Sequence, residues 1–242
     1  MTIESEVRVA NLFDCSVDTD LLTGMRLAKI AISRSQLVVL PTDTVYGIAA
    51  DAFSPAAVEA LLAAKGRGPQ SPPPVLIANQ EALNALATDI HPIALELAKQ
   101  FWPGALTMIF RAQPSLAWNL GETRGTVALR IPDHKIALAL LAETGPLAVS
   151  SANLTGQPAA TTAAAAQDYL GKSVEVYLDA GVSPKGESST ILDLTGLSGE
   201  ANGRIRVVRV GALSLEQIRS VAGQLLEVAA PNDPEAQQEG DS

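Results

Sequence analysis

Short apolar segments alternate along the chain with longer segments of helical periodicity. The apolar segments predict strands over residues 36–40, 75–78, 106–110, 126–131, 147–150, 174–178, 190–194 and 205–210. Strands separated by helices are typical of α/β domains, in which helices cover one large sheet. We therefore expect an α/β or mixed α+β domain, while the pattern leaves the order of the strands open.

The helical segments carry recognisable start and stop signals. Ser54 is placed to cap a helix whose first residue is Pro55, and Gly66 lies near its end. Further helices are predicted from Pro92 to about Phe101, from a cap at Asp133 to about Gly145, within 161–171, and from a capping box of Ser214 and Gln217 toward Val221.

Length and composition fit one domain with two tails. The 242 residues are 47% hydrophobic, which is enough to bury a full core. We expect an N-terminal extension over residues 1–17, the α/β domain over 18–226, and a disordered acidic tail over 227–242. The last segment has no apolar face to bury.

The charge balance and the single cysteine narrow the class of protein. A formal net charge of -9, from 26 acidic and 17 basic residues, argues against a broad nucleic-acid-binding surface, which needs clustered lysine and arginine. Cys15 alone can form neither an intrachain disulfide nor a cysteine-based zinc site. Because there is no secretion-type leader and no apolar run of about 18 residues, we expect a cytoplasmic protein without a membrane span.

The segment 41–47, Pro-Thr-Asp-Thr-Val-Tyr-Gly, follows a predicted strand and concentrates polar groups in one turn. Open α/β sheets bind ligands beyond the carboxyl ends of their strands, which favours a binding site here. An equally good interpretation is a structural turn in which Thr42 and Asp43 cap neighbouring backbone groups.

Lys65 and Arg67 follow a predicted helix and precede a proline-rich loop over 69–74. A stiff loop with two cations is suited to clamp phosphate, with Arg67 able to make bidentate contacts and Lys65 acting as a point charge. Cations are also favoured at helix C-termini for purely structural reasons, which is the competing interpretation.

Ser150 and Ser151 stand at the end of another strand, ahead of Asn153. A nucleophilic serine needs a base, but this segment does not match G-x-S-x-G, and His91 and His134 both lie at predicted helix starts. A Ser-His-Asp hydrolase is therefore disfavoured.

Common nucleotide-binding motifs are missing from the sequence. The segment 171–173, Gly-Lys-Ser, lacks the first glycine of a P-loop because Ala166 stands in its place. No G-x-G-x-x-G pattern supports a dinucleotide fold. If ATP binds, it binds by another arrangement.

Two predicted strands carry arginines at alternating positions. In 126–130, Thr126 and Arg130 share a face, so Arg130 either joins a hydroxyl in a site or is exposed. In 205–210, Arg206 and Arg209 lie on opposite faces, and one of them can point inward.

Several motifs follow one another in a fixed order, namely PTDTVYG, KGR, FWPGALT, TVALR, SANLTG, SSTILD and RVGAL. Together, over about residues 22–221, they resemble the YrdC/TsaC family of threonylcarbamoyl-AMP synthases. The resemblance implies a YrdC-like twisted, open, mixed sheet flanked by helices, with a large concave, positively charged cavity. It also implies the short form of the family, without the extra C-terminal domain of longer members.

The activity that the resemblance implies is a nucleotidyl transfer. L-threonine, bicarbonate and ATP with Mg2+ condense into threonylcarbamoyl-AMP with release of pyrophosphate, and the product serves the threonylcarbamoyl modification of adenosine 37 in tRNA. A separate tRNA threonylcarbamoyl transferase complex would receive the product, so weak or no direct tRNA binding is expected.

The resemblance also implies which residues form the site. Lys65 and Arg67 would be catalytic by neutralising the ATP phosphates. The expected ATP-binding residues are Lys65, Arg67, Thr126, Ser151, Asn153 and Arg209, and the expected threonine-binding residues are Thr42, Thr44, Arg130 and Ser189. No metal site made by the protein is expected, because Mg2+ would be held mainly by the nucleotide.

The chain departs from the common family pattern at Gly68, Leu76, Ala159 and Val210. The resemblance leaves three other functions open: a non-catalytic double-stranded RNA-binding module, a carbamoyl-transfer domain that uses carbamoyl phosphate, and an inactive regulatory member. The net charge argues against the first. Missing acylphosphatase and zinc-finger segments argue against the second.

Overall fold

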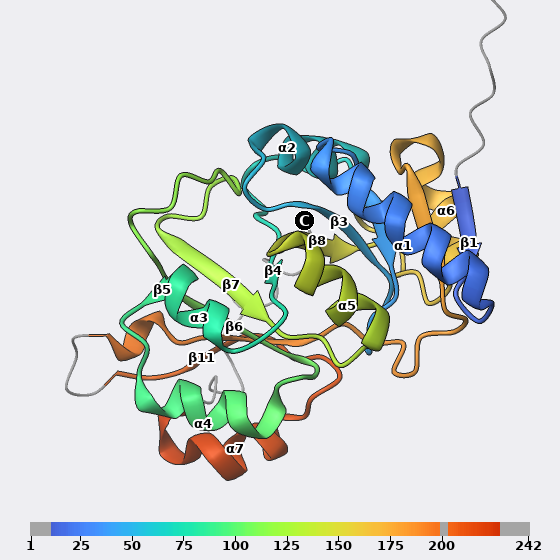
Figure 1. Cartoon of the computed structure of the whole chain (residues 1–242). Helices are drawn as coiled ribbons and strands as arrows, with labels where there is room; N and C mark the ends of the chain where they lie inside the picture. Colours follow the sequence, from blue (N-terminus) through green and yellow to red (C-terminus); the bar gives the residue numbers. More distant parts are fainter. Residues whose placement is uncertain (1–10, 199–202, 228–242) are drawn as a thin grey trace, which may run out of the picture.

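A single twisted sheet with helices on both faces organises the molecule (Figure 1). The structure, a computed structural model, describes residues 11–198 and 203–227. The expected α/β fold class, an open mixed sheet flanked by helices, is confirmed. Among the described residues, no helix is long and apolar enough to cross a membrane.

The elements have the following bounds. The strands are β1 (Asn11–Asp14), β2 (Val38–Leu40), β3 (Gly47–Asp51), β4 (Val75–Leu76), β5 (Ala87–Thr88), β6 (Leu106–Ala112), β7 (Thr126–Arg130), β8 (Leu147–Ser151), β9 (Val176–Asp179), β10 (Thr190–Asp193) and β11 (Arg206–Arg209). The helices are α1 (Asp18–Ser33), α2 (Pro55–Ala64), α3 (Glu81–Leu86), α4 (Pro92–Phe101), α5 (Lys135–Thr144), α6 (Ala163–Leu170) and α7 (Leu215–Ala222).

The hydrogen-bonded order of the strands is β1-β9-β2-β3-β8-β4-β7-β6-β10-β11, with β5 paired to β6. Parallel and antiparallel pairs are mixed: β9 runs parallel to β1 and β2, whereas β3 is antiparallel to β2 and β8. The two-residue strand β4 joins β8 to β7 and so links the two halves of the sheet. Segments far apart in sequence are thereby brought to neighbouring strand ends.

Successive residues of the central strands pack into opposite cores. In β2, Val38 and Leu40 pack with α1 and α5, whereas Val39 belongs to the larger cluster that contains residues of α2, α3, α4, α6 and α7. Because both faces are covered, the central strands are apolar on both sides. Figure 1 shows α1 beside α5 and, at the other end of the molecule, α4 beside α7.

Several predicted helix starts are confirmed. Ser54 Oγ accepts a hydrogen bond from Ala57 N at 3.3 Å at the start of α2. Ser214 and Gln217 form the predicted capping box of α7. The cap predicted at Asp133 is wrong: His134 is the N-cap of α5, and the Asp133 backbone N–H donates instead to the carboxylate of Asp43 at 3.0 Å.

Other elements are absent from the sequence-based prediction. The segment 11–14, which that prediction places in the N-terminal extension, forms the edge strand β1 and pairs with β9. Helix α1 gives little sequence signal at its start, because its N-cap Val17 makes no side-chain cap bond. Strand β3 begins at Gly47, inside the segment interpreted as a turn, and it contains alanines with weak strand preference. The predicted acidic tail lies outside the described residues, apart from Glu227.

Candidate functional site

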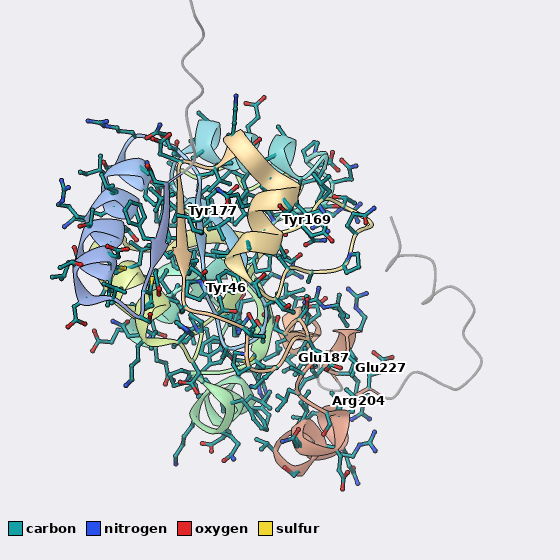
Figure 2. The ribbon with its side chains drawn as sticks, turned by 90° about the vertical axis from the view of Figure 1, so that its right-hand side faces the viewer. Tyr46, Tyr169, Tyr177, Glu187, Arg204 and Glu227 are labelled. Atoms are coloured by element: carbon teal, nitrogen blue, oxygen red, sulfur yellow. The ribbon has the colours of Figure 1, made fainter. Side chains whose placement is uncertain are left out.

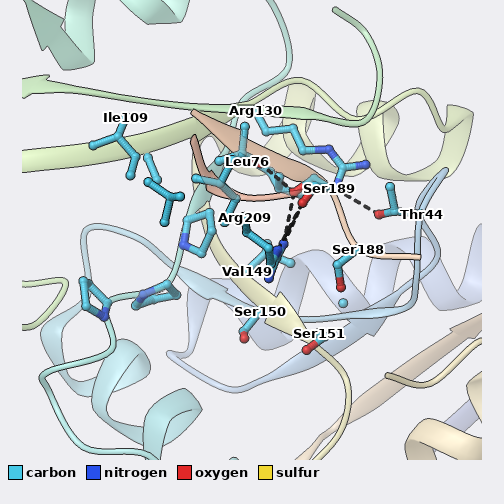
Figure 3. Close-up of a pocket in the computed structure, with 18 of the residues that line it drawn as sticks. Thr44, Leu76, Ile109, Arg130, Val149, Ser150, Ser151, Ser188, Ser189 and Arg209 are labelled. Atoms are coloured by element: carbon cyan, nitrogen blue, oxygen red, sulfur yellow. Dashed lines mark hydrogen bonds between the residues drawn. The ribbon is translucent and has the colours of Figure 1, made fainter. Parts of the chain in front are cut away.

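A cavity of about 310 Å³ lies where ends of several strands meet (Figure 3). Its volume falls within the range of small-molecule sites, roughly 300–1,000 Å³. Residues of β6, β7, β8, β10 and β11 line it, together with residues from the loops around 42–46, 72–74, 120–123 and 188–189. Of the ten predicted site residues, eight line it: Thr42, Thr44, Arg67, Thr126, Arg130, Ser151, Ser189 and Arg209.

Arg130 is enclosed in the cavity wall. It is only 6% exposed, so the alternative of an exposed arginine is wrong. Its Nε donates to Gly104 O at 2.9 Å and its Nη1 to Thr44 Oγ1 at 3.0 Å, while Nη2 donates to the carboxylate of Asp43. Burial lowers the pKa of Arg130 and Asp43 opposes this shift, so the guanidinium stays charged. These bonds use three of its five N–H groups, and the other two make no hydrogen bond to a described residue and can donate to a ligand.

The two threonine hydroxyls of the segment 41–47 form a chain of hydrogen bonds that ends at Arg130. Thr42 Oγ1 donates to Val45 O at 2.6 Å and lies 2.9 Å from Thr44 Oγ1. Because Thr42 has only one hydroxyl hydrogen, Thr44 must be the donor of the second bond while it accepts from Arg130. Thr42 Oγ1 also accepts from Thr44 N at 3.2 Å, so the segment is both a bonded turn and a cavity wall.

Two further arginines reach the cavity from other elements. Arg67 Nη1 lies 3.4 Å from Ser150 Oγ, and Arg209 donates to Ser189 O through Nε at 3.2 Å and Nη2 at 2.9 Å. Burial lowers the pKa of Arg209, and the charges of Arg130 and Arg67 lower it further. Like charges gathered in a partly dry site are stabilised by an anion, so the cavity is suited to phosphate and carboxylate groups.

Strand β11 separates its two arginines as predicted. Arg206 Nη2 forms an ion pair with Asp193 Oδ2 at 3.0 Å, and Arg206 does not line the cavity. Arg209 lies on the other face and lines it (Figure 3).

Lys65 and Asn153 are the two predicted residues that do not line the cavity. Lys65 is 1% exposed, and its Nζ donates to the Ser151 carbonyl and, at 2.7 Å, to Asn153 O. Burial, followed by the charge of Arg67, lowers the pKa of Lys65 to about 7. Asn153 Nδ2 in turn donates to Gln157 O at 2.6 Å. Lys65 therefore ties the end of α2 to the loop after β8.

The predicted site residues leave out several hydroxyls of the cavity, among them those of Thr107, Thr123, Ser150 and Ser188. Thr107 Oγ1 lies 2.8 Å from Ser189 Oγ, and Ser188 lines the wall next to it. A threonine between Leu106 and Met108 was an available signal, because a buried polar side chain in an apolar strand needs a partner.

The serines of the cavity have no histidine base beside them. Ser150 and Ser151 line the cavity, whereas neither His91 nor His134 does. His91 Nδ1 accepts from Ile93 N at 3.2 Å and so caps α4, as predicted. The described residues also contain no group of three or more His, Cys, Asp or Glu side chains that could hold a metal ion. The site is built to hold anions and hydroxyl-bonding ligands.

Most of the chain is similar in sequence to one family of known proteins. The sequence model of the Sua5/YciO/YrdC family, which is described as "Telomere recombination", matches residues 31–211. A Mycobacterium leprae protein named "Putative threonylcarbamoyl-AMP synthase" is 48% identical over 217 residues, which cover 90% of this chain and 96% of that protein. The threonylcarbamoyl-AMP synthase of Pyrococcus abyssi is 38% identical over 203 residues, 83% of this chain and 58% of that protein.

A solved structure shares the fold. The structure of P. abyssi Sua5 complexed with L-threonine superimposes with a TM-score of 0.79 at 34% sequence identity. The superposition covers 90% of this chain and 62% of the archaeal one.

Proposed function

This chain belongs to the Sua5/YciO/YrdC family, and we propose on that premise that it is a threonylcarbamoyl-AMP synthase. It condenses L-threonine, bicarbonate and ATP into threonylcarbamoyl-AMP and releases pyrophosphate. The relatives named for this activity support the proposal, as does the L-threonine complex of P. abyssi Sua5.

The observation that carries the proposal is the convergence of three arginines in one cavity. Arg67, Arg130 and Arg209 come from the loop after α2, from β7 and from β11, yet each lines the same space. The substrates bring a triphosphate and a carboxylate, which together are the kind of anionic load that three guanidinium groups can neutralise.

The proposed division of the site starts from the bonds of Arg130. Arg130, with the linked hydroxyls of Thr44 and Thr42, is proposed to hold threonine by its carboxylate and hydroxyl. Ser189, which is bonded to Thr107 and Arg209 in the same cavity, is proposed to join this subsite. Arg67 and Arg209, with Thr126 and Ser151, are proposed to face ATP. Direct contact of Lys65 and Asn153 with ATP stays a prediction. The bonds of Lys65 position the end of β8 at Ser151 and the loop that follows it.

The chemistry needs no nucleophilic side chain. The threonine amine takes up CO2 from bicarbonate, and a carboxylate oxygen of the resulting carbamate attacks the α-phosphorus of ATP while pyrophosphate leaves. Orientation of the ligands and neutralisation of the phosphates are what the protein supplies. Mg2+ would enter with ATP and help to neutralise the leaving pyrophosphate.

We propose that the product passes to a separate tRNA threonylcarbamoyl transferase complex, for adenosine 37 of tRNA. The alternative of a non-catalytic RNA-binding module is not favoured, because the matched relatives are named as synthases and the net charge is -9. A cytoplasmic location stays a prediction.

Pyrophosphate release tests the proposed function. Purified protein with ATP, Mg2+ and bicarbonate should release pyrophosphate only when L-threonine is added. A salt-dependent affinity for double-stranded RNA without threonine-dependent pyrophosphate release would support the RNA-binding alternative instead.

A further inference from the structure

A loop over residues 180–188, between β9 and β10, is bonded to the segment 41–47. Tyr46 OH donates to Gly181 O at 2.7 Å, and Gly186 N donates to Thr44 O at 3.1 Å. Tyr46 lies in the interior of the molecule, while Glu187 of the same loop is exposed (Figure 2). These bonds hold the loop in place beside the proposed threonine subsite.

Lys185 of this loop faces the buried carboxylate of Asp43. Asp43 Oδ1 accepts from Arg130 and from the Asp133 backbone N–H. Asp43 Oδ2 is buried and has no hydrogen-bond partner among residues 11–198 and 203–227, but Lys185 Nζ lies 3.6 Å from it. Within the described residues, Arg130 and Lys185 are the two cations that form ion pairs with this carboxylate.

Arg130, Asp43 and Lys185 form one charged cluster, and its net charge affects how strongly Arg130 can hold an anion. Asp43 by itself neutralises Arg130, and a neutral pair in a dry wall has little attraction for a substrate carboxylate. Lys185 adds a second cation to the same carboxylate, so the cluster keeps one net positive charge. His134 does not replace it, because burial lowers the pKa of its imidazole and leaves it neutral at pH 7.

We propose that Lys185 is a positioning residue that sets the affinity for L-threonine. It compensates the charge of Asp43, and Arg130 thereby keeps the positive charge that holds the threonine carboxylate. The inference rests on the proposed function, because it takes the carboxylate at Arg130 to be that of threonine. Lys185 itself is 44% exposed on its side chain and is not among the residues that line the cavity.

Titration calorimetry of the full chain with L-threonine, and separately with ATP and Mg2+, tests the inference. Lys185→Gln should weaken L-threonine binding roughly five- to tenfold, because the ion pair is only partly exposed, and should leave ATP binding unchanged. Lys185→Arg should bind threonine as the unchanged protein does. Lys172→Gln, which removes a charge from an exposed lysine outside the cavity, is the matched control.

A double variant separates charge compensation from direct contact with the substrate. Asp43→Asn together with Lys185→Gln restores one net positive charge at Arg130, so its threonine affinity should return to within about twofold of the original. Unchanged threonine binding in Lys185→Gln would overturn the inference, as would an equal loss for ATP or a double variant no better than Lys185→Gln. If the double variant does not fold, the comparison of Lys185→Gln with Lys185→Arg still decides. Failure of the unchanged protein to bind L-threonine would instead refute the proposed function.

Discussion

Replacing Arg67 with alanine is expected to slow pyrophosphate release by about a hundredfold, the usual cost of losing one well-aimed donor to a developing negative charge. Arg67 lines the cavity, and in the part of the chain that the structure describes it makes two side-chain hydrogen bonds, to Thr155 Oγ1 at 3.1 Å and to Ser150 Oγ at 3.4 Å. Each such bond contributes about 1 kcal/mol or less, so the Tm should fall by only a few degrees. Steady-state pyrophosphate release and thermal unfolding, measured on the same preparation, check both parts.

Arg206→Ala is the control for the loss of an arginine. Arg206 is on the same strand, β11, as Arg209, but it does not line the cavity and forms an ion pair with Asp193. Its removal should leave turnover within about twofold, because an exposed ion pair contributes at most about 1 kcal/mol. Equal rate losses in Arg67→Ala and Arg206→Ala would mean that Arg67 acts through the overall charge of the protein rather than on the phosphates.

Replacing Lys65 with methionine is expected to destabilise the fold by about 2–4 kcal/mol, because two buried carbonyls lose their hydrogen-bond donor. Lys65 Nζ is the donor to both the Ser151 and the Asn153 carbonyl, and methionine has a similar length but no N–H. For a domain of this size the loss corresponds to a fall in Tm of about 4–16 °C. Chemical denaturation of both proteins measures it, and a change below about 1 kcal/mol would contradict the structural role of Lys65.

The difference in free energy of unfolding between the unchanged protein and Lys65→Met is expected to increase with pH. The pKa of Lys65 is lowered from 10.5 to about 7, so between these values the unfolded chain binds a proton that the folded chain lacks. The contribution of Lys65 to the free energy of unfolding therefore rises with pH from about 7 to about 10. Lys65→Met should lack this rise, and the gap between the two proteins should widen toward alkaline pH.

The sequence predicts those elements whose local signals agree with their packing. Helices α2 and α7 begin with side-chain caps, and their starts were predicted to the residue. Helix α1 and strand β1 were missed, because the helix has no side-chain cap and the strand is a four-residue, mostly exposed edge. Their places are fixed by tertiary contacts: β1 pairs with β9, and α1 packs against α5.

For the site, the residue types were predictable and their orientations were not. Lys65 and Arg67 look alike in the sequence, since both are cations just after a helix. Gly66 between them has a positive φ of 65°, and the structure sends Lys65 into the interior and Arg67 to the cavity. The pairing of Asp43 with Lys185 could not be predicted either, because it joins two loops that only the folded sheet brings together.

Isotope tracing tests the central claim most directly. The protein is incubated with ATP, Mg2+, L-threonine and ¹³C-labelled bicarbonate, and the adenylates formed are identified at once by mass spectrometry and carbon NMR. We predict an adenylate that contains threonine and the labelled carbon as a carbamate, formed in equal amount with pyrophosphate. Pyrophosphate release that leaves the labelled carbon in bicarbonate, or no threonine-dependent adenylate, would contradict the account.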